Sequence, residues 1–288
     1  MIKTEHLTHI YGVGTPFETA AIEDVSIHIP KGEFVGVIGH TGSGKSTLIS
    51  HFNAILKPTS GRVLIDGRDL WDSDKKVRIQ TRFDVGLVFQ YPEYQLFEET
   101  VYKDIAFGPK NMGLPEDEIE KRVLKAIDFV GLDTNVLKKS PFDLSGGQKR
   151  RVAIAGVMAL EPKVLILDEP AAGLDPKGRD EILGRIRDYH KETKSTILFV
   201  SHSMEDISRN AQSVLVMNRG KCAIHTSVEQ VFERAEELVQ MGLDIPAITR
   251  IFISLQEKGY PVSKNVYTVE QGKSELMRLM KKGGESNA

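Results

Sequence analysis

The feature that most constrains the fold of this chain is a glycine-rich stretch, GHTGSGKST, at residues 39–47. It follows a short apolar run, VGVI, that indicates a buried strand, and its last residues begin STLISHF, which has helical periodicity. A loop of this kind between a strand and a helix leaves backbone N–H groups free to surround an anion. The pattern G-x-x-x-x-G-K-[ST] therefore predicts an α/β fold with a phosphate-binding loop.

Nine residues make up this predicted loop: Gly39, His40, Thr41, Gly42, Ser43, Gly44, Lys45, Ser46 and Thr47. The lysine would place a point charge on the β- and γ-phosphates of a nucleoside triphosphate, and the hydroxyl of Ser46 would ligate Mg²⁺. The N–H and hydroxyl of Thr47, at the start of the helix, would reach the α-phosphate. An ordinary glycine turn is the minor alternative.

The composition is that of a soluble globular protein. Of the 288 residues, 40% are hydrophobic and 27% are charged, and the formal net charge of −2 argues against a generic nucleic-acid-binding protein. A single cysteine, Cys222, permits no internal disulfide and favours a reducing compartment. The first residues lack a signal-peptide pattern, and no apolar run approaches the ~20 residues of a membrane helix. Work at a membrane would therefore require a membrane partner.

Strand-like and helix-like segments alternate along much of the chain, which predicts a mostly parallel sheet. Residues 1–38 are rich in strand patterns and predict an N-terminal β subdomain. From about residue 91 to 160 the patterns are those of amphipathic helices, which predicts a helical insert. Later the strand pattern fades into two short helical patterns. We therefore expect one domain over residues 1–243 and a small C-terminal helical extension over residues 244–288.

A second apolar run, VLILDEP at residues 164–170, predicts a buried strand with two carboxylates at its carboxyl end. Open α/β sheets bind ligands at that end of their strands, so Asp168 and Glu169 are expected near the phosphate-binding loop. Asp168 would hold the metal directly or through water, and Glu169 would polarise the attacking water as a general base. Two acidic residues after an apolar run are by themselves weak evidence for a metal and water site. They are strong evidence here because a phosphate-binding loop precedes them in the same chain.

A second glycine-containing helix start occurs in LSGGQKRR, at residues 144–151. Ser145 followed by Gly146 and Gly147 would leave backbone N–H groups free at a helix N-terminus, which is an anion site. One chain thus carries two candidate phosphate-binding sites, although the loop at residues 39–47 is sufficient to bind one triphosphate.

Five motifs in order resemble those of ATP-binding-cassette (ABC) ATPases: the phosphate-binding loop, LSGGQ, the strand ending in Asp168 and Glu169, AGLD, and a later SH. The resemblance covers roughly residues 1–243 and implies a P-loop NTPase fold of the ABC type. It also implies that two cassettes pair head to tail, with each ATP between the P-loop of one and the LSGGQ of the other. Ser145, Gly146 and Gly147 are then expected at the γ-phosphate held by a partner, and Gln148 is also expected to bind the nucleotide.

The same resemblance implies roles for four further residues. Gln90, at the end of VGLVFQ, matches the Q-loop glutamine that touches Mg²⁺ or water. Asp175 in AGLD matches the D-loop aspartate at the dimer seam, and His202 in VSHS matches the switch histidine that reaches the γ-phosphate. Tyr11 matches the aromatic residue that stacks on adenine. The implied cofactors are ATP and Mg²⁺, with catalytic roles for Gln90, Glu169 and His202 and metal contacts from Ser46, Gln90 and Asp168.

The stretch FQYPEYQLFEETVYKDIAFGPKNMGL, residues 89–114, resembles the ATPases of energy-coupling factor (ECF) transporters, which import vitamins and trace metals. The chain is similar to the second of two paralogous ATPases of that family, and the C-terminal extension matches a segment that helps them dimerise. The resemblance implies a peripheral protein at the cytoplasmic face of the cell membrane. It implies three kinds of partner: a second, paralogous ATPase, a transmembrane coupling subunit, and small membrane substrate-binding components. No nucleic-acid partner is expected.

Three other functions remain open from the sequence: the ATPase of a conventional ABC importer, a soluble ATPase acting on nucleic acid, and a regulatory binder without turnover. The intact Glu169 and His202 argue against the last. A symmetric homodimer is also physically possible. Two interpretations apply to the residues after the Q-loop glutamine, which are Tyr91, Tyr94, Leu96 and Phe97. They would either line a groove for a helix of a membrane partner or pack within the helical insert.

Overall fold

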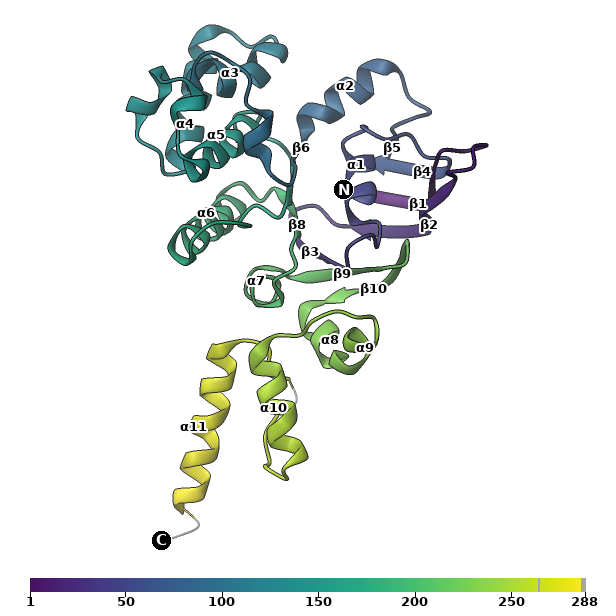
Figure 1. The fold of residues 1–288 in the computed structure, drawn as a ribbon, viewed down its shortest axis with the longest axis vertical. Helices are drawn as coiled ribbons and strands as arrows, with labels where there is room; N and C mark the ends of the chain where they lie inside the picture. The colour runs from purple at the N-terminus through teal and green to yellow at the C-terminus, as the bar shows by residue number, and fades with distance from the viewer. Residues whose placement is uncertain (264, 286–288) are drawn as a thin grey trace.

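The computed structural model of the protein describes residues 1–263 and 265–285, and its strands form two sheets (Figure 1). The smaller sheet is antiparallel, with the order β2-β1-β4-β5. Its strands are β1 (Ile2–Tyr11), β2 (Thr19–Ile29), β4 (Ser60–Ile65) and β5 (Arg68–Asp69). The predicted N-terminal β subdomain is thus present, but β4 and β5 complete it from beyond residue 38. The strand β3 (Phe34–Ile38) joins the other sheet instead.

The larger sheet has the order β10-β9-β3-β8-β7-β6 and is parallel except for β10 at its edge. Its other strands are β6 (Val85–Val88), β7 (Val164–Asp168), β8 (Thr196–Val200), β9 (Ser213–Asn218) and β10 (Lys221–Ser227). In β3, β6, β7 and β8 every residue is buried, as expected where helices cover both faces of a parallel sheet. The expected mostly parallel α/β fold is confirmed.

Helices connect these strands. The α-helices before β7 are α1 (Lys45–Phe52), α2 (Lys75–Asp84), α3 (Val101–Asn111), α4 (Glu116–Phe129) and α5 (Gly146–Met158). Those after it are α6 (Pro176–Thr193), α7 (Met204–Asn210), α8 (Val228–Glu233), α9 (Ala235–Gln240), α10 (Ala247–Glu257) and α11 (Val269–Glu285). Short 3-10 turns are η1 (Pro92–Gln95), η2 (Thr134–Lys138) and η3 (Pro141–Asp143). Within the described residues, no helix is both long enough and apolar enough to span a bilayer.

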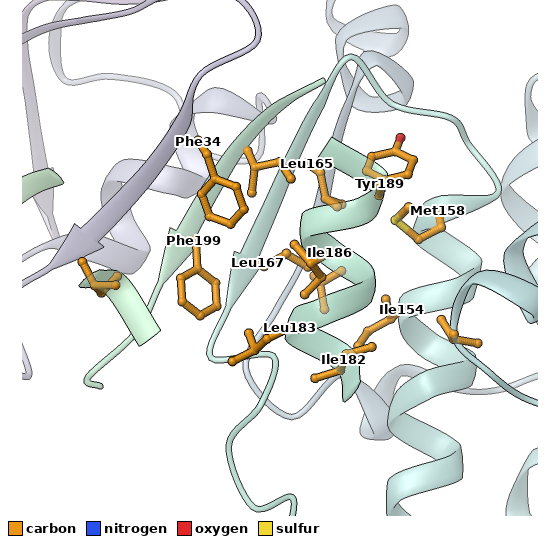
Figure 2. Close-up of a cluster of buried hydrophobic side chains, with 14 of the residues drawn as sticks. Phe34, Ile154, Met158, Leu165, Leu167, Ile182, Leu183, Ile186, Tyr189 and Phe199 are labelled. Atoms are coloured by element: carbon orange, nitrogen blue, oxygen red, sulfur yellow. The ribbon is translucent and has the colours of Figure 1, made fainter. Parts of the chain in front are cut away.

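Alternate residues of β7 pack on opposite faces of the larger sheet. Leu165 and Leu167 lie in one buried cluster with side chains of α5 and α6, as Figure 2 shows. Val164 and Ile166 lie in the other buried cluster, with Leu48 of α1. The helices α5 and α6 therefore cover one face of the sheet, and α1 covers the other. This arrangement decides where the two candidate phosphate-binding sites lie.

Between β6 and β7, all of the secondary structure is helical. In Figure 1 the helices α3, α4 and α5 form a group beside the sheet, and α3 packs on both of the others. Their apolar faces share one buried cluster, which includes Ile105, Val123 and Val152. This group is the helical insert of the expected fold class.

The C-terminal helices α10 and α11 project away from the sheets (Figure 1). They pack closely at Gly272, where a Cβ would lie 2.8 Å from the side chain of Ile248. A small separate cluster, with Phe252 at its centre, holds them together. They are the two helices expected after residue 242, whereas α8 and α9 were not expected. Residues 264 and 286–288 of the expected 244–288 extension lie outside the described residues.

Candidate functional site

The carboxyl ends of four adjacent strands, β3, β8, β7 and β6, form the edge where most of the predicted site residues gather. The phosphate-binding loop follows β3, and His202 follows β8. Asp168 ends β7 with Glu169 directly after it, and Gln90 follows β6. Parallel strands bring their carboxyl ends to one edge, so residues far apart in the sequence become neighbours there.

The phosphate-binding loop turns tightly between β3 and α1, and two glycines are needed for that path. Gly39 has a φ of 155°, and a Cβ built on it would lie 2.4 Å from the carbonyl oxygen of Met217. Gly44 has a φ of 101°, and a Cβ there would lie 2.7 Å from the carbonyl oxygen of Ala21. Because a side chain at either position would collide with backbone, only glycine fits at the two fixed positions of the motif.

The Lys45 side chain is buried inside this loop. Its Nζ donates hydrogen bonds to the carbonyl oxygens of Gly39, at 2.6 Å, and His40, at 3.1 Å. Burial lowers the pKa of Lys45, while the charges of Asp168 and Glu169 act in the opposite direction. The ammonium group is therefore held between the loop and the two carboxylates, a suitable position for binding phosphate oxygens.

Ser46, at the start of α1, contacts Asp168, at the end of β7. The serine Oγ donates to the aspartate Oδ2 at 3.4 Å. Burial raises the pKa of Asp168, and the bond from Ser46 and the charge of Lys45 lower it in part. A hydroxyl and a carboxylate side by side are the type of oxygen ligands that a hard cation prefers. Among the described residues, no group of three or more histidine, cysteine or acidic side chains offers another metal site.

Glu169 lies beside His202 with its carboxyl group largely buried. Its backbone has a left-handed φ of 52°, and its N–H donates to the carbonyl oxygen of Val200 at 3.1 Å. Its Oε1 lies 3.8 Å from Nε2 of His202 and has no hydrogen-bond partner in the described part of the chain. Burial raises the pKa of Glu169 to about 7, and partial burial lowers the pKa of His202. A carboxyl group that titrates near neutral pH meets the requirement for a general base.

Replacing Glu169 by glutamine is expected to stabilise the nucleotide-free protein, and more strongly at high pH. Below its ordinary pKa of 4.5 the carboxyl is protonated in the folded and unfolded chains alike, so it does not alter stability there. From pH 4.5 to about 7 the unfolded chain has released this proton while the folded protein keeps it on the buried carboxyl, and above about 7 both forms are ionised. The folded state progressively loses about 3 kcal/mol over this interval, at ~1.36 kcal/mol per pH unit.

Urea denaturation at two pH values measures this effect. The free energy of unfolding of Glu169→Gln should exceed that of the original protein by up to about 3 kcal/mol at pH 8 and by much less at pH 5. An equal difference at both pH values would contradict the raised pKa.

Tyr11, the last residue of β1, lies over the start of α1. Its hydroxyl oxygen is 3.4 Å from Oγ1 of Thr47, the last residue of the phosphate-binding loop. The tyrosine side chain is 44% exposed, so part of the ring is available to a ligand. The structure thus brings Tyr11 next to Thr47, the residue expected at the α-phosphate. A ring that stacks on the base must lie near this end of the phosphate chain, because the nucleoside is attached there.

The LSGGQ residues form the exposed N-terminus of α5 and are not part of the group around Lys45. Ser145 caps the helix in a capping box, because its Oγ accepts from the N–H of Gln148 and its own N–H donates to Oε1 of Gln148. Ser145 and Gly146 are exposed. This second site is therefore accessible to another molecule, and its helix packs on the face of the larger sheet opposite α1.

Gln90 and Asp175 both lie at the surface. The side chain of Gln90 is exposed, and within the described residues no hydrogen bond joins it to Asp168 or Ser46. Asp175 caps α6, where its Oδ1 accepts from the N–H of Gly178 at 3.3 Å. Their expected roles, a metal contact for Gln90 and a dimer contact for Asp175, remain predictions.

Comparison with known proteins gives the family. The sequence matches the ABC transporter family over residues 22–172. It is 59% identical over 279 residues to the energy-coupling factor transporter ATP-binding protein EcfA2 of Clostridium tetani, with 96% of each chain covered. It is 54% identical to the EcfA2 protein of Clostridium perfringens, with 97% of this chain and 98% of the other covered. The chain is an ABC ATPase of the energy-coupling factor type.

Two solved structures share the fold of this ABC ATPase. One is cbiO1 from Clostridium perfringens, described as part of the ABC transporter complex cbiONQ. It has a TM-score of 0.73 and 40% identity, with 90% of this chain and 96% of the other covered. The other is the ATP-binding cassette MJ0796, solved as a dimer after hydrolysis with ADP and Pi. It has a TM-score of 0.72 and 28% identity, with 79% of this chain and 99% of the other covered. The expected ABC fold and ATPase activity are confirmed.

A buried ion pair in this ABC ATPase was missed from the sequence. Arg150 of α5 is buried, and its Nε and Nη2 donate to the two carboxylate oxygens of Glu93 at 3.0 and 2.9 Å. This bidentate pair joins the helix that begins at LSGGQ to the segment after Gln90. The two residues are 57 positions apart, so only the folded chain reveals the pairing.

A second missed contact joins α6, which Asp175 caps, to the loop of His202. Arg179 donates to Oδ2 of Asp206 at 2.7 Å and to Oγ of Ser203 at 2.6 Å. The available sequence signal was an arginine one turn after Asp175 and an aspartate four residues after His202. Neither residue indicates its partner by itself.

The residues after Gln90 divide between the two interpretations. Leu96 is buried in the core of the helical group, so it packs within the insert. Tyr91, Tyr94 and Phe97 are exposed, at 50%, 85% and 59%. The ring of Phe97 packs edge to face on Phe107 of α3, with 4.9 Å between centroids. An exposed aromatic group therefore lies next to the Q-loop.

Proposed function

We propose that this chain is the ATP-binding and ATP-hydrolysing subunit of an energy-coupling factor importer, which powers the uptake of a vitamin or a trace metal. The observation that carries this proposal is the meeting of Lys45, Asp168 and Glu169 at one edge of the sheet, in a chain similar over nearly its whole length to EcfA2 proteins. The lysine supplies a cation for the phosphates, and the carboxylates supply the contacts for metal and water.

ATP binds at this edge together with Mg²⁺. Residues 39–47 surround the phosphates, and the adenine stacks on Tyr11. Ser46, Asp168 and Gln90 would supply oxygen ligands for Mg²⁺, and the contact of 3.4 Å between Ser46 and Asp168 supports the first two of these assignments. Bound Mg²⁺ neutralises negative charge on the phosphates and so favours attack by a nucleophile.

Glu169 acts as the general base for the attacking water. Its buried Oε1 has no partner within the described chain, and its pKa of about 7 suits it to accept a proton near neutral pH. His202 lies 3.8 Å from it with a side chain that is 56% exposed, so the imidazole has room to turn toward the γ-phosphate. A lowered pKa keeps His202 neutral near pH 7, with one N–H to donate to a phosphate oxygen.

The LSGGQ segment completes the ATP site of a partner ATPase. Residues 145–148 begin α5, on the face of the sheet opposite α1, which supports a role outside their own chain. In a head-to-tail pair, the N–H groups and hydroxyl at this helix N-terminus meet the γ-phosphate on the partner's P-loop. Asp175, exposed at the start of α6, contributes to the seam. ATP then holds the pair closed, and hydrolysis reopens it.

The partner ATPase is a paralogue, and the pair acts on a transmembrane coupling subunit that serves small membrane substrate-binding components. The exposed aromatic side chains of Tyr91, Tyr94 and Phe97 suit an amphipathic helix of that subunit. The extension over residues 244–288 aids dimerisation, which the exposed Met277 and Met280 of α11 support. The chain then lies at the cytoplasmic face of the membrane as a peripheral protein.

Purification of the tagged chain from its native membrane in mild detergent tests this assembly. Mass spectrometry should find a second ATPase, one shared transmembrane protein and several small membrane proteins. Tyr94→Asp should lose the membrane proteins and keep the second ATPase, whereas Ile79→Asp on α2, also an exposed position, should keep both. A dedicated permease with an external binding protein would indicate a conventional importer. Ribosomes or DNA without any membrane protein would contradict transport.

A further inference from the structure

Three aromatic rings form a continuous row between the smaller sheet and α1. The rings of Tyr11 and His9, both on β1, lie 4.5 Å apart between centroids with an interplanar angle of 75°. The rings of His9 and His51, the latter on α1, lie 4.9 Å apart at 74°. Both contacts are edge to face, a favoured arrangement of aromatic rings. The row runs from the half-exposed Tyr11 to the fully buried His51.

The row results from a match between the spacings of a strand and a helix. Tyr11 and His9 are two positions apart on β1, so they share one face and lie ~6.7 Å apart along the strand. Thr47 and His51 are four positions apart on α1, so they share one side of the helix and lie ~6 Å apart along its axis. Tyr11 thus contacts Thr47 where His9 contacts His51. The buried contact between His9 and His51 thereby fixes the distance between Tyr11 and Thr47.

Both histidine rings are anchored to the backbone. Nδ1 of His51 lies 2.7 Å from the carbonyl oxygen of Thr47, and Nδ1 of His9 lies 3.1 Å from that of Lys57. Because a carbonyl oxygen only accepts, each Nδ1 carries a proton and donates it. The bond from His51 ends on Thr47, a residue of the phosphate-binding loop. The row therefore ties the orientation of the Tyr11 ring to that loop.

Packing alone does not account for a histidine at position 51. Nε2 of His51 is buried and has no hydrogen-bond partner among the described residues, which is unfavourable. Burial also lowers the pKa of His51 to about 4, so the ring stays neutral at physiological pH. A leucine or phenylalanine would fill the same space without an unpaired polar atom. An unpaired buried polar atom in a native protein requires an explanation other than apolar packing.

We propose that His9 and His51 are positioning residues for the nucleotide base. They hold the Tyr11 ring at a fixed height and tilt above Thr47, so that the purine of ATP stacks on a ring that is already oriented. This inference rests on the proposed adenine contact of Tyr11. It means that the two histidines contribute to the binding of the base and not to the binding of the phosphates.

Equilibrium titrations of the isolated chain with magnesium-ATP and with magnesium-tripolyphosphate separate these two contributions. His9→Ala should raise the Kd for ATP about tenfold, equivalent to ~1.4 kcal/mol, which is within the range for a base stacked on an aromatic ring. The Kd for tripolyphosphate should change by less than about twofold, because Lys45 and its loop are unaltered. His9→Phe, which keeps an edge-to-face ring, should recover most of the affinity for ATP.

Tyr11→Ala in the same titrations separates the positioning role from the base site itself. If Tyr11→Ala weakens ATP binding and His9→Ala does not, the positioning role is wrong and the proposed base site stands. If Tyr11→Ala leaves the Kd for ATP unchanged, both are wrong. An equal loss of affinity for ATP and tripolyphosphate in His9→Ala would indicate a damaged phosphate-binding loop and would also overturn the inference.

Two further variants complete the experiment. His28→Ala, at an exposed position of β2, is the matched control and should bind both ligands as the original chain does. If His9→Ala folds poorly, His51→Leu provides the same comparison, because leucine fills the space but removes both the ring on which His9 packs and the bond to Thr47. It should weaken the binding of ATP and leave that of tripolyphosphate unchanged.

Discussion

Replacing Glu169 by glutamine is expected to lower the rate of ATP hydrolysis by about 10²- to 10⁴-fold, the usual contribution of a general base. Glutamine has nearly the same shape but cannot take a proton from the attacking water. ATP binding should persist, because Lys45 and Ser46 are untouched. The variant should therefore accumulate as a closed, ATP-bound pair. Steady-state hydrolysis and size-exclusion chromatography with magnesium-ATP measure the two effects.

The pH dependence of the unmodified enzyme provides a second measure of the same assignment. Raising the pH through about 7 deprotonates Glu169, so kcat/KM should rise about tenfold per pH unit below 7 and level off above it. The residual activity of Glu169→Gln should lack this rise. Glu192→Gln, at an exposed position of α6, should keep the original rate and profile. Fast turnover by Glu169→Gln would exclude Glu169 as the base.

Those parts of the site that depend on a few consecutive residues were predictable from the sequence. The P-loop is one, because Gly39 and Gly44 adopt backbone angles that other residues rarely take, at a fixed distance from Lys45. The start of α5 is another, because Ser145 and Gln148 form a capping box within four residues. In both, the local sequence determines the local geometry, so the motif is sufficient.

Properties set by contacts between distant segments were not predictable. The raised pKa of Glu169 comes from burial, which depends on the packing of neighbouring strands. The pairing of Arg150 with Glu93 joins residues 57 positions apart. Leu96 and Phe97 are adjacent, yet one is buried and the other exposed. They follow a short 3-10 turn, where neither the helical nor the strand period applies, so the sequence left their burial undecided.

The presence of two phosphate-binding sites in one chain leads to the second large expected effect. Consider a pair made of this chain and an unmodified sister ATPase. Lys45→Ala or Gly146→Asp in this chain should each leave one of the two ATP sites functional, and the double variant should leave neither functional. Lys45→Ala removes the cation of this chain's own P-loop and should weaken ATP binding there by about 10- to 100-fold, the range for a charged hydrogen bond. The site on the sister's P-loop keeps the LSGGQ of this chain and should still bind ATP.

Gly146→Asp is suited to test the other site because its own chain should tolerate it. No described atom beyond the backbone of α5 itself lies within 4 Å of a Cβ placed there, and a carboxylate in the first turn of a helix is favourable. The isolated variant should therefore fold and bind ATP normally. In the pair, the added carboxylate would face the γ-phosphate on the sister's P-loop and repel it, so trapping at that site should be lost.

The number of ATP molecules trapped per pair distinguishes the two arrangements. If LSGGQ serves the partner's ATP, the unmodified pair traps two, each single variant traps one, and the double variant traps none, because the substitutions affect different sites. If LSGGQ served the ATP on its own P-loop, both substitutions would damage the same site. The double variant would then trap as much ATP as either single variant. The placement of α1 and α5 on opposite faces of the sheet favours the first outcome.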